Sequence, residues 1–246
     1  MRFAALLLVL FSTSILAADI PLAERKSGYE FMSRETRAMQ DDEQTGPAVL
    51  WLLDGEELWN RNCNGCHGIE RMKGVAVRYP ALDSKIKKLV NLEQRINLCR
   101  TEEQKAPAFK YESRELLSLT AFVARQSRGL PIAVEMNETT KPFIEAGRAE
   151  FERKRGQLNL SCAQCHDDQW GRKLAGTPIP QAHPTGYPIY RLEWQGLGSL
   201  ERRLRNCMIG VRAEPYGYGA EEYRVLELFL MWRARGMTLE SPGVRP

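Results

Sequence analysis

Histidine is scarce in this chain of 246 residues, which has only three, and the net charge of +4 is too small to indicate nucleic acid binding. The chain also lacks strand-like alternation, and after its first residues it has no apolar run near the roughly 20 residues that a spanning helix needs. A charged fraction of 27% with scattered aromatic residues is typical of a folded protein. These absences exclude a disordered or membrane-embedded chain and favour a helical protein in solution.

The first 18 residues have the pattern of a secretory signal peptide. Arg2 is followed by the apolar run FAALLLVLFSTSIL, then by Ala17 and Ala18, and then by the polar Asp19. A membrane anchor is the alternative, but Thr13 and Ser14 interrupt the apolar run, which is too short to span a bilayer. We therefore predict cleavage near Ala18 and export of a soluble mature protein.

Four of the six cysteines fall in two identical C-x-x-C-H frames. Each cysteine pair can bond the two vinyl groups of a haem, and the adjacent histidine can then ligate the iron. An even number of cysteines in an exported protein also allows disulfides, and one such frame alone allows a zinc or redox site. Two copies that hold two of the three histidines favour two covalently bound haem c groups. The frames are Cys63-Asn64-Gly65-Cys66-His67 and Cys162-Ala163-Gln164-Cys165-His166.

The sequence around each frame is similar, which indicates an internal repeat. Before each frame a glycine precedes an aromatic residue by four positions, and after it comes the pattern L-E-x-R-x-x-x-C. An apolar helical segment then follows and stops at a glycine. The corresponding segments are 55–59 and 147–151, 92–99 and 200–207, and 116–128 and 226–235, with the terminal glycines Gly129 and Gly236.

This pattern predicts an all-α fold with two cytochrome c-like haem domains. We place a signal peptide at 1–18, an N-terminal extension that packs on the first domain at 19–50, the first domain at 51–138 and the second, catalytic domain at 139–246. The boundary falls in the polar stretch 136–141. Prolines and glycines at 176–188 predict a long loop in the second domain.

Cys99 and Cys207 end the two L-E-x-R-x-x-x-C segments, which makes them candidates for the second axial ligand of each iron. A disulfide between them is the alternative, and Met208 is another candidate ligand in the second domain. His183, in a loop among prolines, is expected to face solvent or to lie outside the set of iron ligands. A thiolate ligand stabilises ferric iron and lowers its potential, which suits chemistry on a reducing sulfur compound.

Several segments resemble the SoxA family, the subunits of SoxAX cytochromes that act as L-cysteine S-thiosulfotransferases in periplasmic thiosulfate oxidation. The resemblance covers nearly the whole mature chain and is to the two-haem form. Its segments are 27–33 (SGYEFMS), 36–42 (TRAMQDD), 55–59 (GEELW), both C-x-x-C-H frames, and Arg203, Asn206, Cys207 and Met208 followed by Glu214-Pro215-Tyr216.

The resemblance implies a reaction and partners. The residue matching Cys207 ligates the catalytic haem and carries an extra sulfur atom as a persulfide. The partner is SoxX, a one-haem cytochrome c, and the active site lies where the two subunits meet. The reaction joins thiosulfate to a cysteine thiol of the carrier protein SoxYZ, and two electrons leave through haem to a downstream cytochrome. The resemblance leaves the role of the first haem open.

Arginines surround Cys207. Arg203 precedes it by four residues, so both lie on one face of a helix. A guanidinium there can bind the sulfonate of thiosulfate through two hydrogen bonds, so Cys207 and Arg203 are the predicted catalytic residues. Arg202, Arg205 and Arg212 are expected to pair with haem propionates or Glu201. A dihaem electron carrier remains the alternative function, and a dihaem peroxidase is a third for which the sequence has no supporting motif.

Overall fold

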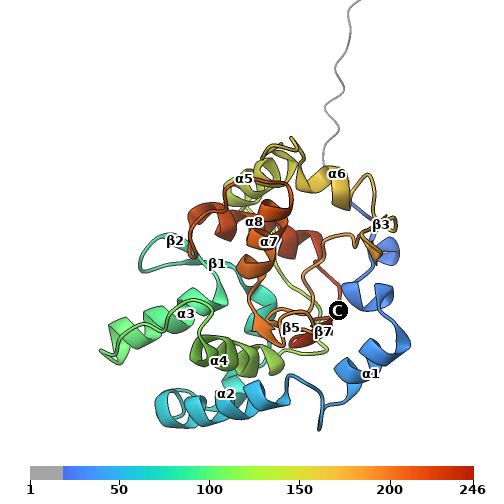
Figure 1. Ribbon diagram of the computed structural model, residues 1–246. Coiled ribbons are helices and arrows are strands. Elements are labelled where there is room, and N and C mark those ends of the chain that lie inside the picture. Colours follow the sequence, from blue (N-terminus) through green and yellow to red (C-terminus); the bar gives the residue numbers. More distant parts are fainter. Residues whose placement is uncertain (1–18) are drawn as a thin grey trace, which may run out of the picture.

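The computed structural model describes residues 19–246, so the predicted signal peptide lies outside the described residues (Figure 1). No helix within residues 19–246 is long and apolar enough to cross a membrane. The helices are α1 (Arg34–Asp41), α2 (Val49–Asn62), α3 (Leu92–Leu98), α4 (Arg114–Arg125), α5 (Lys141–Glu152), α6 (Cys162–His166), α7 (Leu200–Gly210) and α8 (Glu221–Arg233). Short 3₁₀ turns are η1 (Leu22–Glu24), η2 (Gly28–Phe31), η3 (Ile69–Met72) and η4 (Ala76–Arg78), and η5 (Cys99–Glu103) is a π-helical turn that continues α3.

The fold is rich in helix, as predicted, but it is not all-α. Two hairpins and one three-stranded sheet are present, in which β5 lies between antiparallel β6 and parallel β7. Their strands have only two or three residues, which is too short for alternation of polar and apolar residues to reveal them in the sequence. The strands are β1 (Ala81–Asp83), β2 (Lys88–Val90), β3 (Lys173–Leu174), β4 (Thr177–Pro178), β5 (Ile189–Arg191), β6 (Gly196–Gly198) and β7 (Gly243–Arg245).

Two helix pairs, α2 with α4 and α5 with α8, lie towards opposite ends of the molecule (Figure 1). Each pair is in close contact at a buried glycine. A Cβ on Gly55 would lie 2.2 Å from the carbonyl oxygen of Ser118, and a Cβ on Gly147 would lie 2.0 Å from that of Val225. The aromatic residue four positions later then packs on the partner helix, with ring centroids 6.2 Å apart for Trp59 and Phe122. For Phe151 and Phe229 the centroids are 5.4 Å apart.

The hydrophobic core is shared by both predicted domains. Trp59 and Leu119 from the first half belong to the same buried cluster as Phe151 and Phe229 from the second. The β1–β2 hairpin and the antiparallel pair β5–β6 each contact the other half, since β2 contacts α8 and β6 contacts α4. The two halves are therefore held together by apolar burial as well as by the chain between them.

The hydrogen bonds that the N-terminal extension makes with the rest of the chain go mostly to the second half. The amide of Lys26 donates to Gln181 Oε1 over 2.6 Å, and the amide of Val244 donates to Gln40 Oε1 over 2.9 Å. Only the end of the extension reaches the first domain, where Glu43 pairs with Arg125 at 2.8 Å. The predicted apolar segments are found as α4 and α8, but α4 ends four residues before Gly129 and α8 ends three residues before Gly236.

Candidate functional site

The second C-x-x-C-H frame forms the short helix α6. Ser161 caps it by accepting a hydrogen bond from the amide of Gln164, whose side chain in turn accepts from the amide of Ser161. Cys162 and Cys165 lie three residues apart on this helix, so both thiols are on one face. Burial raises the pKa of the Cys162 thiol to about 11.

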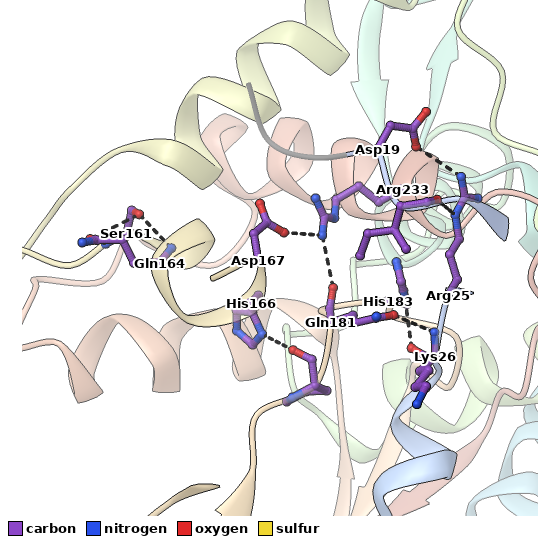
Figure 2. Close-up of polar contacts among 12 residues, drawn as sticks. Asp19, Arg25, Lys26, Ser161, Gln164, His166, Asp167, Gln181, His183 and Arg233 are labelled. Carbon is purple, nitrogen blue, oxygen red and sulfur yellow. Dashed lines mark hydrogen bonds and ion pairs between the residues drawn. The ribbon is translucent and has the colours of Figure 1, made fainter. Parts of the chain in front are cut away.

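The ring of His166 is held in place by the proline-rich loop. Its Nδ1 donates to the carbonyl oxygen of Pro180 over 2.7 Å (Figure 2). Because a carbonyl only accepts, Nδ1 carries a proton, so in the neutral ring Nε2 has the lone pair that can bind a metal. The next residue, Asp167, pairs with Arg233 of α8 at 2.6 Å, and Arg233 also donates to the carbonyl of Gln181. Helix α8 therefore contacts both the end of the C-x-x-C-H frame and the proline-rich loop.

Cys207 lies on α7 with its thiol in contact with the ring of His166. It is half-buried in the described chain. Burial acts to raise the pKa of this thiol, but the contact with His166 and the charges of Arg203 and Arg191 outweigh it and lower the pKa. The site therefore favours a thiolate opposite a histidine ring.

Arg203, one turn before Cys207, is the cation with the strongest electrostatic interaction with this thiolate. The charge of Cys207 raises the pKa of Arg203 against the effect of burial. Within residues 19–246 the guanidinium of Arg203 has no carboxylate within ion-pair distance. Tyr187, just before β5, and Arg191, the last residue of β5, are close enough to interact electrostatically with both Arg203 and Cys207.

The other arginines near Cys207 have partners elsewhere. Arg202 stacks over Trp194 at 4.2 Å and lies 3.9 Å from Glu112, whereas Arg205 lies 4.6 Å from the ring of Tyr218. Arg212 is exposed. Met208 is buried, and its sulfur accepts a hydrogen bond from Tyr223 at 3.3 Å. Neither Met208 nor these arginines compete with Cys207 and Arg203 in this geometry.

The first C-x-x-C-H frame is a turn at the end of α2 rather than a helix. The amides of Cys66 and His67 both donate to the carbonyl of Cys63. Cys99, at the end of α3, is close enough to Cys63 for its charge to act on that thiol. Burial and this charge raise the pKa of Cys63 to about 11. The structure thus brings Cys63, Cys66 and Cys99 together in the first half, as it brings Cys162, Cys165 and Cys207 together in the second.

The two cations next to Cys99, Arg95 and Arg100, both have partners within the protein. Arg95, one turn before Cys99, forms an ion pair of 2.6 Å with Asp83. Arg100 is buried, stacks over Phe109 at 3.7 Å and donates to the carbonyl of Pro107. This site therefore has no cation comparable to Arg203.

All six cysteines are free, so Cys99 and Cys207 do not form a disulfide. In residues 19–246 no group of three or more His, Cys, Asp or Glu side chains is placed to hold a metal ion. His183 does not face solvent as one expectation had it. It is only 8% exposed, its Nδ1 donates to the carbonyl of Lys26 over 2.9 Å, and burial lowers its pKa to about 4.

These residues fit haem c. A covalently attached haem needs two thiols three residues apart, and its iron needs an axial histidine and an opposed donor, which are the groups that meet at His166 and Cys207. The first site has a further sign of a bound polar group, because Trp59, one turn before Cys63, has its Nε1 buried without a hydrogen-bond partner in the described chain. Haem propionates are acceptors of the kind that such a donor lacks.

The sequence reasoning missed the residues that position this site. Pro180, which anchors His166, and Arg191, which adds a second cation, come from the loop and hairpin after the frame. Prolines in the loop were visible in the sequence, but nothing there indicated which carbonyl would face the histidine. The spacing that matched Cys99 with Cys207 also matches Asp83 with Arg191, and a comparison at that spacing would have found the second cation.

Comparisons with known proteins agree with this geometry. A family model described as SoxA/TsdA, cytochrome c domain, matches residues 54–132 and 146–239. The chain is 32% identical to the L-cysteine S-thiosulfotransferase subunit SoxA of Pseudaminobacter salicylatoxidans over 92% of this chain and 82% of that protein. It is 33% identical to the subunit of the same name from Allochromatium vinosum, over 92% and 84%.

The fold is also that of a solved structure. The structure superimposes on a chain of the crystal structure of SoxXA from P. pantotrophus with a TM-score of 0.87 and 29% identity, covering 90% of this chain and 87% of that one. The family match covers most of the chain, and the relatives align over nearly all of it. The chain therefore belongs to the SoxA family of cytochrome c subunits of L-cysteine S-thiosulfotransferase.

Proposed function

We propose that this chain catalyses the oxidative conjugation of thiosulfate to a cysteine thiol of a SoxYZ-like carrier protein. In this reaction the thiol loses its proton, a sulfur–sulfur bond forms to thiosulfate, and two electrons pass to a cytochrome acceptor. The observation that carries the proposal is the thiol of Cys207, which contacts His166 and has the unpaired cation Arg203 one turn away. The names of the relatives support sulfur transfer over simple electron transport.

The chain is proposed to carry two covalently bound haem c groups. Cys63 and Cys66 would attach the first, and Cys162 and Cys165 the second. The iron ligands would be His67 with Cys99 and His166 with Cys207. When bound, haem supplies a one-electron acceptor beside the reacting sulfur.

Cys207 and Arg203 are the proposed catalytic residues. Cys207 presents its sulfur at the end of a positively charged stretch of α7, which favours the approach of an anion. Arg203 binds the sulfonate, because a planar guanidinium matches two oxygens at once and no described carboxylate neutralises it. Cys99 lacks such a cation, since Arg95 is paired with Asp83, so the first haem is not the site of conjugation.

The remaining proposals concern organisation. The two haem domains, 51–138 and 139–246, would descend from an internal repeat, which is supported by the matching glycine contacts at Gly55 and Gly147. A signal peptide at 1–18 would direct the chain to the periplasm. By analogy with the solved SoxXA structure, the partner would be a SoxX-like cytochrome with one haem.

The test is conjugation by the Cys207→Ser protein. The haem-loaded complex is incubated with thiosulfate, the carrier and an oxidised cytochrome, and the carrier's intact mass is measured. Cys207→Ser should abolish the thiosulfate adduct while the intact mass of this chain still includes two haems. Cys99→Ser is the matched control and should conjugate nearly normally. Conjugation by Cys207→Ser at the normal rate would leave this chain an electron carrier.

A further inference from the structure

The two hairpins that precede α3 and α7 have the same register, but the last residue of the first strand has opposite charges in the two. Asp83 ends β1 and pairs with Lys88 of β2, and Arg191 ends β5 and pairs with Gly196 of β6. The interval between Asp83 and Arg191 is also the interval between Cys99 and Cys207. A carboxylate in the first site thus has its counterpart in a guanidinium in the second.

In the first site both oxygens of this carboxylate have hydrogen-bond or ion-pair partners. Asp83 Oδ1 accepts hydrogen bonds from the amides of Lys85 and Ile86, and Oδ2 forms the 2.6 Å ion pair with Arg95. The side chain of Asp83 is only 8% exposed, so the pair is partly shielded from water. Arg95 is the counterpart of Arg203. Because Arg95 forms an ion pair with Asp83, its charge is neutralised and it does not bind an added anion.

In the second site the same place adds a positive charge. Arg191 is held by its Nε, which donates to the carbonyl of Pro246 over 2.9 Å and lies 3.1 Å from Glu193. Its side chain is 13% exposed, and in residues 19–246 its two Nη groups have no hydrogen-bond partner. Arg191 and Arg203 thus bring two guanidinium groups toward Cys207, and the carboxylate that neutralises the first site has no counterpart there.

The charges of Arg191 and Arg203 act on each other, so nearby anions stabilise the pair. Burial first, and then the charge of Arg203, lowers the pKa of Arg191, while the charges of Glu193 and Cys207 act in the opposite direction. Glu193 offsets only part of this charge, because its side chain is 49% exposed and its ion pair is screened by water. A dianion between the two guanidinium groups would compensate both.

We propose that Arg191 is a second substrate-binding residue, which together with Arg203 binds the sulfonate of thiosulfate beside Cys207. The charge at this hairpin position determines which of the two sites binds a dianion. Asp83 neutralises the cation of the first site, whereas Arg191 adds a second cation to the other site. This inference rests on the proposed function, since it assigns the substrate contacts of the same site.

The test is calorimetric titration of thiosulfate into the oxidised, haem-loaded complex without carrier. Arg191→Met should raise the dissociation constant about 10-fold or more, as expected for the loss of one charge-assisted contact. Arg191→Asp should raise it further, because the new carboxylate can pair with Arg203 as Asp83 pairs with Arg95. Arg191→Lys should restore part of the affinity. In turnover, Arg191→Met should raise KM for thiosulfate with little change in kcat.

The outcomes separate the two proposals. Unchanged thiosulfate affinity in Arg191→Met and Arg191→Asp overturns the inference, while conjugation by the unaltered complex still upholds the proposed function. A change in haem spectrum or potential with unchanged affinity assigns Arg191 to a haem propionate and also overturns it. If the unaltered complex binds thiosulfate through Arg191 but fails to conjugate it, the proposed function is wrong and the proposed binding site is upheld. If Arg191→Met does not fold, Arg191→Lys and Arg191→Asp give the same comparison.

Discussion

Nδ1 of His166 lies 2.7 Å from the carbonyl oxygen of Pro180, and no equivalent hydrogen bond to the ring of His67 is found in residues 19–246. The contact fixes the tautomer and the orientation of the ring that touches Cys207. The two proposed histidine ligands are therefore held differently. The second site is preorganised by a loop of its own domain, whereas the first is a turn with less support.

This difference predicts two distinguishable haem signals. If His67–Cys99 and His166–Cys207 ligate the two irons, paramagnetic resonance of the oxidised protein should show two low-spin ferric species of the histidine–thiolate type. Cys99→Met should change one species and leave the other intact, because the two thiols lie in separate halves of the chain. Signals of histidine–methionine type in the unaltered protein would contradict thiolate ligation.

Gly147→Ala should destabilise the haem-loaded protein. Alanine stabilises a helix by about 1 kcal/mol relative to glycine, but the new methyl group would lie 2.0 Å from the carbonyl oxygen of Val225 in a buried helix contact. Overpacking of this kind costs about 1–3 kcal/mol, so the clash outweighs the helix propensity. Denaturant unfolding measures the difference.

The control is Gly210→Ala at the exposed end of α7, where no described atom lies within 4 Å of the added methyl group. This change should be neutral or slightly stabilising. Equal effects of the two substitutions on the free energy of unfolding would show that the contact of α5 with α8 tolerates a methyl group, against the geometry.

Residues close together in the sequence made much of this site predictable. The C-x-x-C-H frames and the L-E-x-R-x-x-x-C segments placed Cys207 and Arg203 one turn apart, because the period of a helix fixes that relation. The strands were missed, since β5 has only three residues and is held by β6 and β7. The contacts of the N-terminal extension with the second half could not be foreseen, because its order in the chain gave no sign that Lys26 would bond Gln181.

Four carboxylates interact with one another where the two halves of the chain meet, and they predict a pH dependence of stability. They are Glu93, Glu112, Glu201 and Glu227. Burial, followed by the charges of Glu201 and Glu112, raises the pKa of Glu93 to about 7, and burial also raises the pKa of Glu227. Asn91 donates to Glu227 at 3.1 Å and to Glu201 at 3.5 Å. The charges of Arg202, Arg205 and Arg224 offset the effect of burial on this cluster only in part.

A carboxyl with a raised pKa in the folded state stabilises the fold while it is protonated. Its contribution is fully present below its ordinary pKa of about 4.5 and is lost as the pH rises through about 7. The free energy of unfolding should therefore fall over this range. Glu93→Gln should reduce the slope by up to about 1.4 kcal/mol per pH unit, and it should stabilise the protein at pH 8. Glu56→Gln, at an exposed position on α2, is the control, and an unchanged slope in Glu93→Gln would refute the prediction.

Arg203→Ala should lower kcat/KM for conjugation while both haems stay attached. The substitution removes a charge-assisted contact worth roughly 1.5–3 kcal/mol, which corresponds to about 10- to 150-fold. Arg95→Ala is the matched control, since Arg95 has the same place before Cys99 but is paired with Asp83, and its loss should leave kcat/KM nearly unchanged. Arg202→Ala is a second control on α7 itself, because Arg202 stacks on Trp194. If Arg202→Ala and Arg203→Ala slowed the reaction equally, the effect would come from the general positive field of α7, and Arg203 would not be the residue that binds the sulfonate.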